Sequence, residues 1–222
     1  MEDLSIYLQP SEFYDFNKKI VMNKALEITD GLRSQKERAI ALFYWVRDEI
    51  KYNMALFVPK VKNYFIASKT IKRREGFCVS KSILLSTLAR AVGIPARIHL
   101  CDLINHLISQ KIIDFMGHNV MYYHGYSEFY LKNRWIKLTP SFDKATALKG
   151  GFLPMVEFDG ENDAVFPPYD INGNKFGEYI RDRGVYTDLP LDDIDKLFQE
   201  KYKMYQDHLG GPQRVENHKD LI

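Results

Sequence analysis

The segment from Gly76 to Arg97 constrains the fold of this chain most strongly. Apolar residues recur in its middle at steps of three and four, which predicts a helix with one buried face. They are Ile83, Leu84, Leu88 and Ala91. Gly93 and Pro95 follow them, and both residue types end helices. The segment therefore predicts a helix that begins near Cys78 and stops before Gly93.

Cys78 lies at or just inside the N-terminus of this predicted helix. The unpaired backbone N–H groups and the positive end of the helix dipole favour an anion there, so we expect a stabilised thiolate with a lowered pKa. A cysteine in that position can act as a nucleophile. The alternative is that Cys78 is a small buried hydrophobic residue, which is the usual environment of a free cysteine.

A second segment, residues 124–143, contains two short runs rich in aromatic and β-branched residues. Lys132-Asn133-Arg134 separates the two runs, and this pattern predicts a β-hairpin. His124 stands at the head of the first arm, so it lies near the residues that close the second arm.

These two segments resemble the transglutaminase-like superfamily of papain-like cysteine enzymes. The family pattern is a Gly-x-Cys helix ending in Gly-Ile-Pro-Ala-Arg, then His-Ala-Trp-x-Glu-x-Tyr on one strand and Trp-x-x-x-Asp-Pro on the next. The matching residues are Gly76, Cys78, residues 93–97, His124, Glu128, Tyr130, Trp135 and Pro140. The resemblance covers residues 40–145 and is that of a bacterial- or archaeal-type single-domain member.

The resemblance implies an α+β fold, in which the helix that bears Cys78 packs on an antiparallel sheet that bears His124 and a third residue. It also implies acyl transfer through a thioester. Cys78 would attack an amide carbonyl of a peptide or protein, and His124 would move the proton. Water as acceptor makes such an enzyme a peptidase or amidase, and an amine makes it a transglutaminase. We expect hydrolysis, with no cofactor and no metal ion.

One residue departs from the family pattern, because Thr139 stands where the family has an aspartate before the proline. A carboxylate orients and stabilises an imidazolium better than a hydroxyl does. Either Asp143, four residues later, or Thr139 itself would hold the imidazole.

The departure also supports a different class, a catalytically inactive module that binds a peptide or protein in the same cleft. Retention of both Cys78 and His124 favours the enzyme. A structural or assembly protein, with a C-terminal helix as its contact, would show no thiol reactivity.

Composition excludes several other classes. The 222 residues have a formal charge of +2, and no basic tract indicates nucleic-acid binding. No apolar run is long enough to span a membrane, and the start Met1-Glu2-Asp3 lacks a secretory pattern. With only two cysteines, Cys78 and Cys101, a disulfide framework is not expected, so we predict a cytoplasmic protein and place Cys101 in the core.

We divide the chain into three parts. Residues 1–33 form an N-terminal lead-in element, and residues 34–145 form the transglutaminase-like core. Residues 146–222 form an extension that packs on the core, with an amphipathic tail helix over residues 192–205. Apart from that helix we expect the extension to contain mostly loops and short strands, because glycine and proline interrupt it.

Periodicity places the remaining elements. Leu4, Ile6 and Leu8 alternate, which predicts an extended lead-in, and a short helix follows near residues 17–29. Residues 34–51 form the clearest amphipathic helix, with Ser34 and Glu37 as a capping box. Other expected elements are an irregular link over residues 58–75, a strand over 96–103, a helix over 105–116 and a strand from residue 120.

Two patterns invite a metal interpretation, and we reject both. His99, His106 and His118 lack the close spacing of a ligand pair on one element. The acidic residues between Glu157 and Asp163 lack the spacing of a calcium-binding loop.

Overall fold

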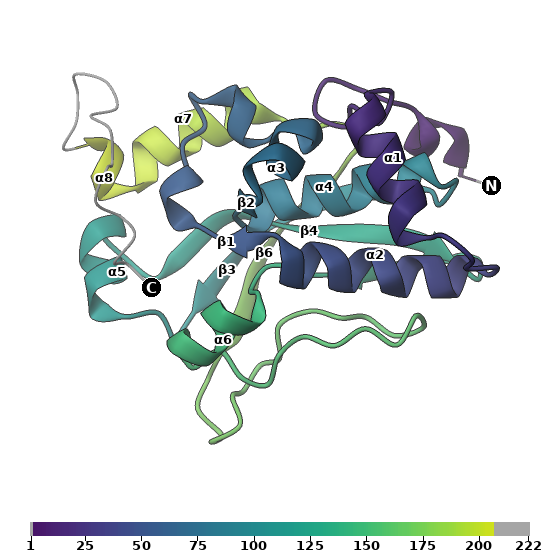
Figure 1. Cartoon of the computed structure of the whole chain (residues 1–222). Helices are drawn as coiled ribbons and strands as arrows, with labels where there is room; N and C mark the ends of the chain where they lie inside the picture. Colours follow the sequence, from purple (N-terminus) through teal and green to yellow (C-terminus); the bar gives the residue numbers. More distant parts are fainter. Residues whose placement is uncertain (1, 207–222) are drawn as a thin grey trace.

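A computed structural model describes residues 2–206. Its centre is a four-stranded antiparallel sheet in the order β5-β4-β3-β6 (Figure 1). The strands are β3 (Ala96–Asn105), β4 (Val120–Leu131), β5 (Arg134–Leu138) and β6 (Gly177–Tyr186). Helices and an antiparallel sheet pack together, so the α+β prediction is confirmed.

The helix α4 (Cys78–Ala91) packs against β3 and β4. All of its residues from Cys78 to Arg90 are buried, because three further helices cover its other sides (Figure 1). They are α1 (Lys19–Ile28), α2 (Gln35–Glu49) and α3 (Ala67–Arg73). The prediction of one apolar face was too narrow, since a helix covered on all sides is the centre of the core.

The start of α2 is formed as the sequence predicts. The Ser34 hydroxyl accepts a hydrogen bond from the backbone N–H of Glu37, and the Glu37 carboxylate accepts one from the backbone N–H of Ser34. This capping box satisfies two groups that the first helical turn leaves unpaired. The helix over residues 17–29 is also confirmed, as α1.

Two predictions for the first 75 residues were wrong. Residues 4–8 form a 3-10 helix, η1 (Leu4–Leu8), because the Asp3 carboxylate caps it at the Ser5 N–H, and they are not extended. The supposed irregular link holds α3, whose buried face packs on α4. It also holds η3 (Lys62–Tyr64) and ends at β2 (Glu75–Gly76), while η2 (Met54–Leu56) lies just before it. β2 pairs in parallel with β1 (Lys51–Tyr52) and so joins the end of α2 to the start of α4.

The predicted hairpin is β4 and β5, joined by Lys132 and Asn133. Both residues have positive φ, of 50° and 62°, as a two-residue turn with the twist of a hairpin requires. The helix expected over residues 105–116 is shorter, as α5 (Gln110–Met116), because β3 continues to Asn105 and Ser109 caps the helix.

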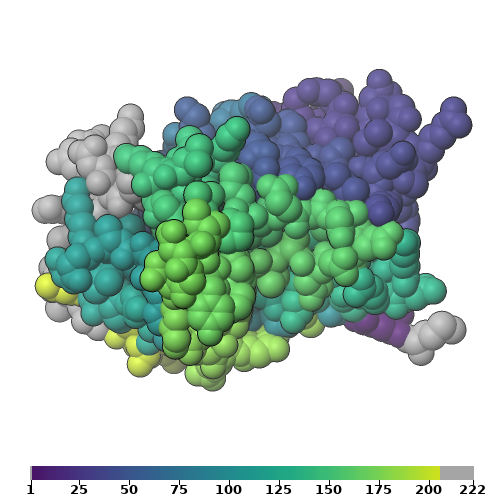
Figure 2. Space-filling view, turned by 90° about the horizontal axis from the view of Figure 1, so that it is seen from below, coloured from purple at the N-terminus to yellow at the C-terminus, as the bar shows by residue number. Residues whose placement is uncertain are grey.

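The C-terminal part contributes a strand to the central sheet. It contains α6 (Lys144–Gly150), β6, α7 (Leu191–Lys201) and α8 (Lys203–Gln206). β6 pairs with β3 over its whole length, so the part expected to hold mostly loops and short strands also holds a strand of 10 residues. Seen from below, the segment after α6 covers the middle of one face (Figure 2). Residues 207–222 of the predicted extension lie outside the described residues.

Between residues 2 and 206, no helix has both the length and the apolar character needed to cross a membrane.

Candidate active site

Cys78 is the first residue of α4, and the contact between α4 and β4 places it beside His124. The Ser82 hydroxyl donates to the Gly125 carbonyl at 3.0 Å, and the Ser127 hydroxyl donates to the Ser82 carbonyl at 2.8 Å. A Cβ atom on Gly125 would lie 3.2 Å from the Val79 Cα, which is tighter than an ordinary contact, so glycine favours this close approach. The residue next to His124 therefore touches the start of the Cys78 helix.

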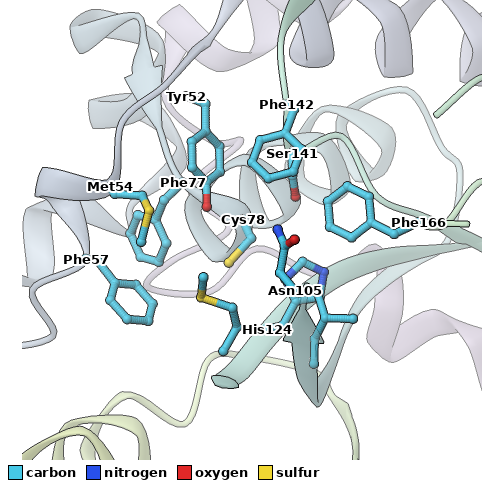
Figure 3. Close-up of a pocket in the computed structure, with 12 residues that line it drawn as sticks. Tyr52, Met54, Phe57, Phe77, Cys78, Asn105, His124, Ser141, Phe142 and Phe166 are labelled. Atoms are coloured by element: carbon cyan, nitrogen blue, oxygen red, sulfur yellow. The ribbon is translucent and has the colours of Figure 1, made fainter. Parts of the chain in front are cut away.

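Cys78 and His124 line one enclosed cavity (Figure 3). Its volume is about 20 Å³, which is room for one water molecule and for no substrate side chain. Three more polar side chains line it, those of Tyr52, Asn105 and Ser141. The remaining lining residues are apolar: Met54, Phe57, Phe77, Leu103, Met121, Phe142 and Phe166. A substrate can reach Cys78 only after some of this lining moves.

Burial controls the protonation of both groups. It raises the pKa of the Cys78 thiol to about 11, although the backbone N–H groups of Gly125, Val79 and Cys78 itself lower it in part. Burial also lowers the pKa of the His124 imidazole to about 3. Our prediction of a lowered thiol pKa was therefore wrong for this closed cavity, because desolvation outweighs the helix N-terminus. A neutral thiol faces a neutral imidazole at pH 7.

Three buried polar atoms at this end of the sheet lack a hydrogen-bond partner among the described residues. They are His124 Nε2, Thr139 Oγ1 and Ser141 Oγ. Thr139 follows β5 and lies beside the hydroxyl of Tyr179, whose ring centroid is 6.3 Å from that of His124. Unpaired buried polar groups are rare and costly in folded proteins, so these three atoms make this end of the sheet a candidate site.

Asp143, the other predicted partner of the imidazole, is engaged elsewhere. Its carboxylate accepts hydrogen bonds from the backbone N–H of Tyr52 at 2.7 Å and from the backbone N–H of Thr146 at 3.0 Å. It also accepts one from the Thr146 hydroxyl at 2.8 Å, and it caps the N-terminus of α6. Neither Asp143 nor Thr139 is among the residues that line the cavity with His124.

Tyr52 is a site residue that our sequence analysis missed. Its ring packs on Phe142 with the ring centroids 4.8 Å apart, and its hydroxyl points toward Cys78 (Figure 3). The backbone N–H of Cys78 lies close enough to that hydroxyl to lower its pKa in part, although burial raises the pKa overall. No motif marked Tyr52, because its position depends on the β1–β2 pair and on a contact with Asp143, which is 91 residues away.

The buried Lys81 supports the same arrangement from within α4. Its ammonium donates to the carbonyl oxygens of Arg47 at 2.9 Å and Ile50 at 2.5 Å, at the end of α2. Burial lowers the Lys81 pKa to about 7, and the nearby Asp143 carboxylate partly opposes the shift. Lys81 and Asp143 therefore hold the chain on either side of Lys51, just where it enters the cavity with Tyr52.

Three other residues of the family pattern, Glu128, Tyr130 and Trp135, lie on the same face of the sheet as His124, farther along β4 and β5. Glu128 binds the Arg97 guanidinium at 2.7 Å and the His99 ring at 2.8 Å, and Arg97 stacks over the Trp135 ring at 3.8 Å. Cys101 is buried in β3, as predicted. Across the part of the chain that the structure describes, no three His, Cys, Asp or Glu side chains are grouped so that they could hold a metal ion.

Comparison with solved structures finds proteins with partial similarity, among them the following two. A protein from Cytophaga hutchinsonii, described as a putative cysteine protease, is 20% identical with a TM-score of 0.49, over 68% of this chain and 45% of that one. A protein from Parabacteroides distasonis, described as a putative protease, is 14% identical with a TM-score of 0.40, over 62% of this chain and 25% of that one. This chain thus covers less than half of either protein.

Among curated proteins none matches the chain. The sequence profile of the Transglutaminase-like superfamily matches residues 23–140, which is more than half of the chain. This match includes Cys78, His124 and Thr139. It confirms the resemblance on which our sequence analysis relied, and the chain belongs to the transglutaminase-like superfamily.

Proposed function

We propose that this protein is a cysteine-dependent acyl-transfer enzyme that acts on amide bonds of peptides or proteins. The observation that carries the proposal is the enclosed cavity in which Cys78, at a helix N-terminus, faces His124. A neutral imidazole is able to accept a proton, and a thiol beside it can become a nucleophile as it loses one. The paucity of cysteine suits a reducing compartment, so we propose a cytoplasmic location.

The reaction begins when the Cys78 sulfur attacks the amide carbonyl while His124 takes the thiol proton. The carbonyl electrons move to oxygen, and the C–N bond then breaks as the imidazolium gives its proton to the leaving amine. The product is a thioester on Cys78. Water, deprotonated by His124, attacks the thioester carbonyl. The C–S bond then breaks, the imidazolium returns its proton to the Cys78 sulfur, and a carboxylic acid is released; an amine in place of water would give a new amide. We propose hydrolysis as the main outcome.

Tyr52 is placed to stabilise the tetrahedral intermediate. Its hydroxyl points toward Cys78, and the Cys78 backbone N–H lies beside that hydroxyl. Both groups can donate a hydrogen bond. A negatively charged oxygen formed there would receive two hydrogen bonds, which is the arrangement that lowers the barrier to acyl transfer.

We propose Thr139 as the residue that orients the imidazole. It occupies the family's aspartate position, and within residues 2–206 neither its hydroxyl nor His124 Nε2 has a hydrogen-bond partner. Asp143 is less suited, because its hydrogen bonds go to Tyr52 and Thr146.

Alkylation by iodoacetamide tests the cysteine–histidine pair without any knowledge of the substrate. We expect Cys78 to be labelled at pH 7 in the native protein and His124→Ala to slow the reaction about 100-fold, the usual contribution of a general base. Cys101 serves as an internal control, because it is buried and burial raises its pKa as well. Equal labelling with and without His124 would favour the inactive binding module.

A further inference from the structure

Strand β4 contains an extra residue immediately before His124. Cys101 of β3 pairs with His124, and Leu103 pairs with Met121, so Tyr122 and Tyr123 together stand opposite Asp102 alone. Two residues opposite one define a β-bulge, which turns the strand and changes the direction of the side chains that follow.

The bulge decides where the His124 side chain lies. Met121 and His124 are three positions apart, and a regular strand would direct them to opposite faces of the sheet. Both nevertheless line the cavity beside Cys78. The extra residue is what brings His124 to the same cavity as Met121.

The bulge cannot be held by the usual strand hydrogen bonds alone. Tyr123 has a φ of 52°, which is unfavourable for a residue with a bulky side chain. Its N–H donates to Asp102 Oδ1 at 3.2 Å, and the N–H of Tyr122 donates to the hydroxyl of Tyr202 at 2.7 Å. Two side chains therefore accept the N–H groups that the bulge displaces.

Asp102 of β3 is itself held by Arg183 of β6, the strand that lies on the other side of β3 from β4. Arg183 Nε donates to Oδ1 at 2.5 Å and a terminal nitrogen donates to Oδ2 at 2.8 Å. The exposed fractions of these side chains are 3% for Asp102 and 10% for Arg183. The guanidinium also lies 4.4 Å from the Tyr123 ring centroid. Arg183 is the extra residue of a second bulge, between the pairs of Leu100 with Gly184 and Cys101 with Asp182.

We propose that Asp102 and Arg183 form a positioning pair, which holds the bulge at Tyr123 and thereby keeps the His124 ring in the cavity beside Cys78. The pair touches neither the cavity nor a reacting atom, and it acts through the backbone of β4. Its effect on reactivity rests on the function proposed above, whereas its effect on the place of His124 does not.

The direct test replaces both charges together, as Asp102→Leu/Arg183→Met. Removal of one partner would leave the other charge buried and unpaired, whereas removal of both is tolerated far better. NMR titration of the His124 ring then reports its position. We expect no titration of His124 above pH 5 in the native protein, since burial holds its pKa near 3, and titration toward its usual pKa of 6.5 in the double variant. His124→Ala identifies the resonance. A His124 ring that still does not titrate would overturn the proposal.

Iodoacetamide labelling of Cys78 gives the second readout. We expect the double variant to lose about 100-fold in rate, the scale of a 1 Å displacement of a reacting group, and the same change to have no effect in a His124→Ala background. Asp102→Asn keeps the shape of the side chain and weakens the ion pair, so its rate of Cys78 labelling should fall about tenfold. If the double variant does not fold, the labelling rate of Asp102→Asn tests the proposal instead. An unchanged labelling rate in Asp102→Asn and in the folded double variant would contradict the proposed positioning role of Asp102 and Arg183. It would not contradict the proposed enzyme function.

Arg90→Met is the matched control. Arg90 is also a buried arginine, and it donates to the carbonyl oxygens of Ala96, Gln9 and Thr187 rather than to a carboxylate near His124. Its replacement should lower stability without changing the His124 titration. If native Cys78 reacts no faster than Cys78 in His124→Ala, the proposed enzyme is wrong, and the titration alone still decides whether Asp102 and Arg183 position His124.

Discussion

The backbone N–H of Tyr52 donates a 2.7 Å hydrogen bond to the carboxylate of Asp143. This contact joins β1 to the start of α6, and the Tyr52 hydroxyl points toward Cys78. The carboxylate that our sequence analysis offered as a partner for His124 therefore supports the other side of the cavity.

Tyr52→Phe should separate acylation from alkylation. Attack on an ester forms an oxyanion, whereas alkylation by iodoacetamide does not, so only acylation needs the Tyr52 hydroxyl. We expect acylation of Cys78 by p-nitrophenyl acetate to slow about 100-fold, the usual loss for one oxyanion donor, and alkylation to stay within about twofold. Tyr44→Phe is the control, because its hydroxyl binds Glu157, away from the cavity. Equal slowing of both reactions would remove Tyr52 from the oxyanion site.

Asp143→Ala should lower stability without removing the effect of His124. The substitution deletes an N-cap of α6, which costs about 1 kcal/mol, together with the bond to Tyr52. Urea unfolding measures the loss, and Ser109→Ala, which removes the cap of α5, is the control. His124-dependent alkylation should persist in Asp143→Ala. If it disappears while the Ser109 variant keeps it, Asp143 and not Thr139 is the partner of the imidazole.

Thr139→Val should make the protein more stable and less reactive. The Thr139 hydroxyl is buried without a partner among the described residues, so an isosteric methyl group removes a desolvation cost of about 1 kcal/mol. The His124-dependent rate of Cys78 alkylation should fall. Thr87→Val provides the contrast, since the Thr87 hydroxyl donates to the Ile83 carbonyl at 2.6 Å and its loss should destabilise. A Thr139→Val protein with the native rate would exclude Thr139 as the orienting residue.

Lys81→Met should change how stability depends on pH. The folded-state pKa of Lys81 is about 7 and the ordinary value is 10.5, so between these values the folded protein binds fewer protons than the unfolded chain. The contribution of Lys81 to the free energy of unfolding therefore rises as the pH rises across that interval. It falls again as the pH falls toward 7. We expect the difference between native protein and Lys81→Met to grow by about 1 kcal/mol per pH unit in urea titrations from pH 7 to 10.

The matched control for this effect is Lys149→Met, at an exposed position in α6. It should show no such slope. A constant difference between native protein and Lys81→Met over the same interval would mean that Lys81 stays charged in its buried position, held by the Arg47 and Ile50 carbonyls.

Sequence patterns that span only a few residues were sufficient to predict several secondary-structure elements. The capping box at Ser34 and Glu37 predicted the start of α2, and Lys132-Asn133-Arg134 predicted the hairpin turn, which the structure narrows to Lys132 and Asn133. The same kind of pattern placed Cys78 at a helix start.

Features that depend on distant contacts were not predictable in this way. β6 was missed because its sequence, with Gly184 and several charges, lacks a strand's alternation; it is an edge strand that pairs only with β3. The bulge at Tyr123 depends on Asp102 and Arg183 from two other elements. The raised pKa of Cys78 depends on how completely the surrounding side chains exclude water, and a position in the sequence does not reveal that.

Intact-mass spectrometry of the protein during reaction with p-nitrophenyl acetate tests the central claim most directly. The account predicts an acetyl group on Cys78 that forms with a burst of nitrophenolate and then disappears as water hydrolyses the thioester. Cys78→Ala should form no such adduct, and His124→Ala should form it much more slowly. Acetylation confined to lysines, or acetylation of Cys78 at the same rate without His124, would contradict the account.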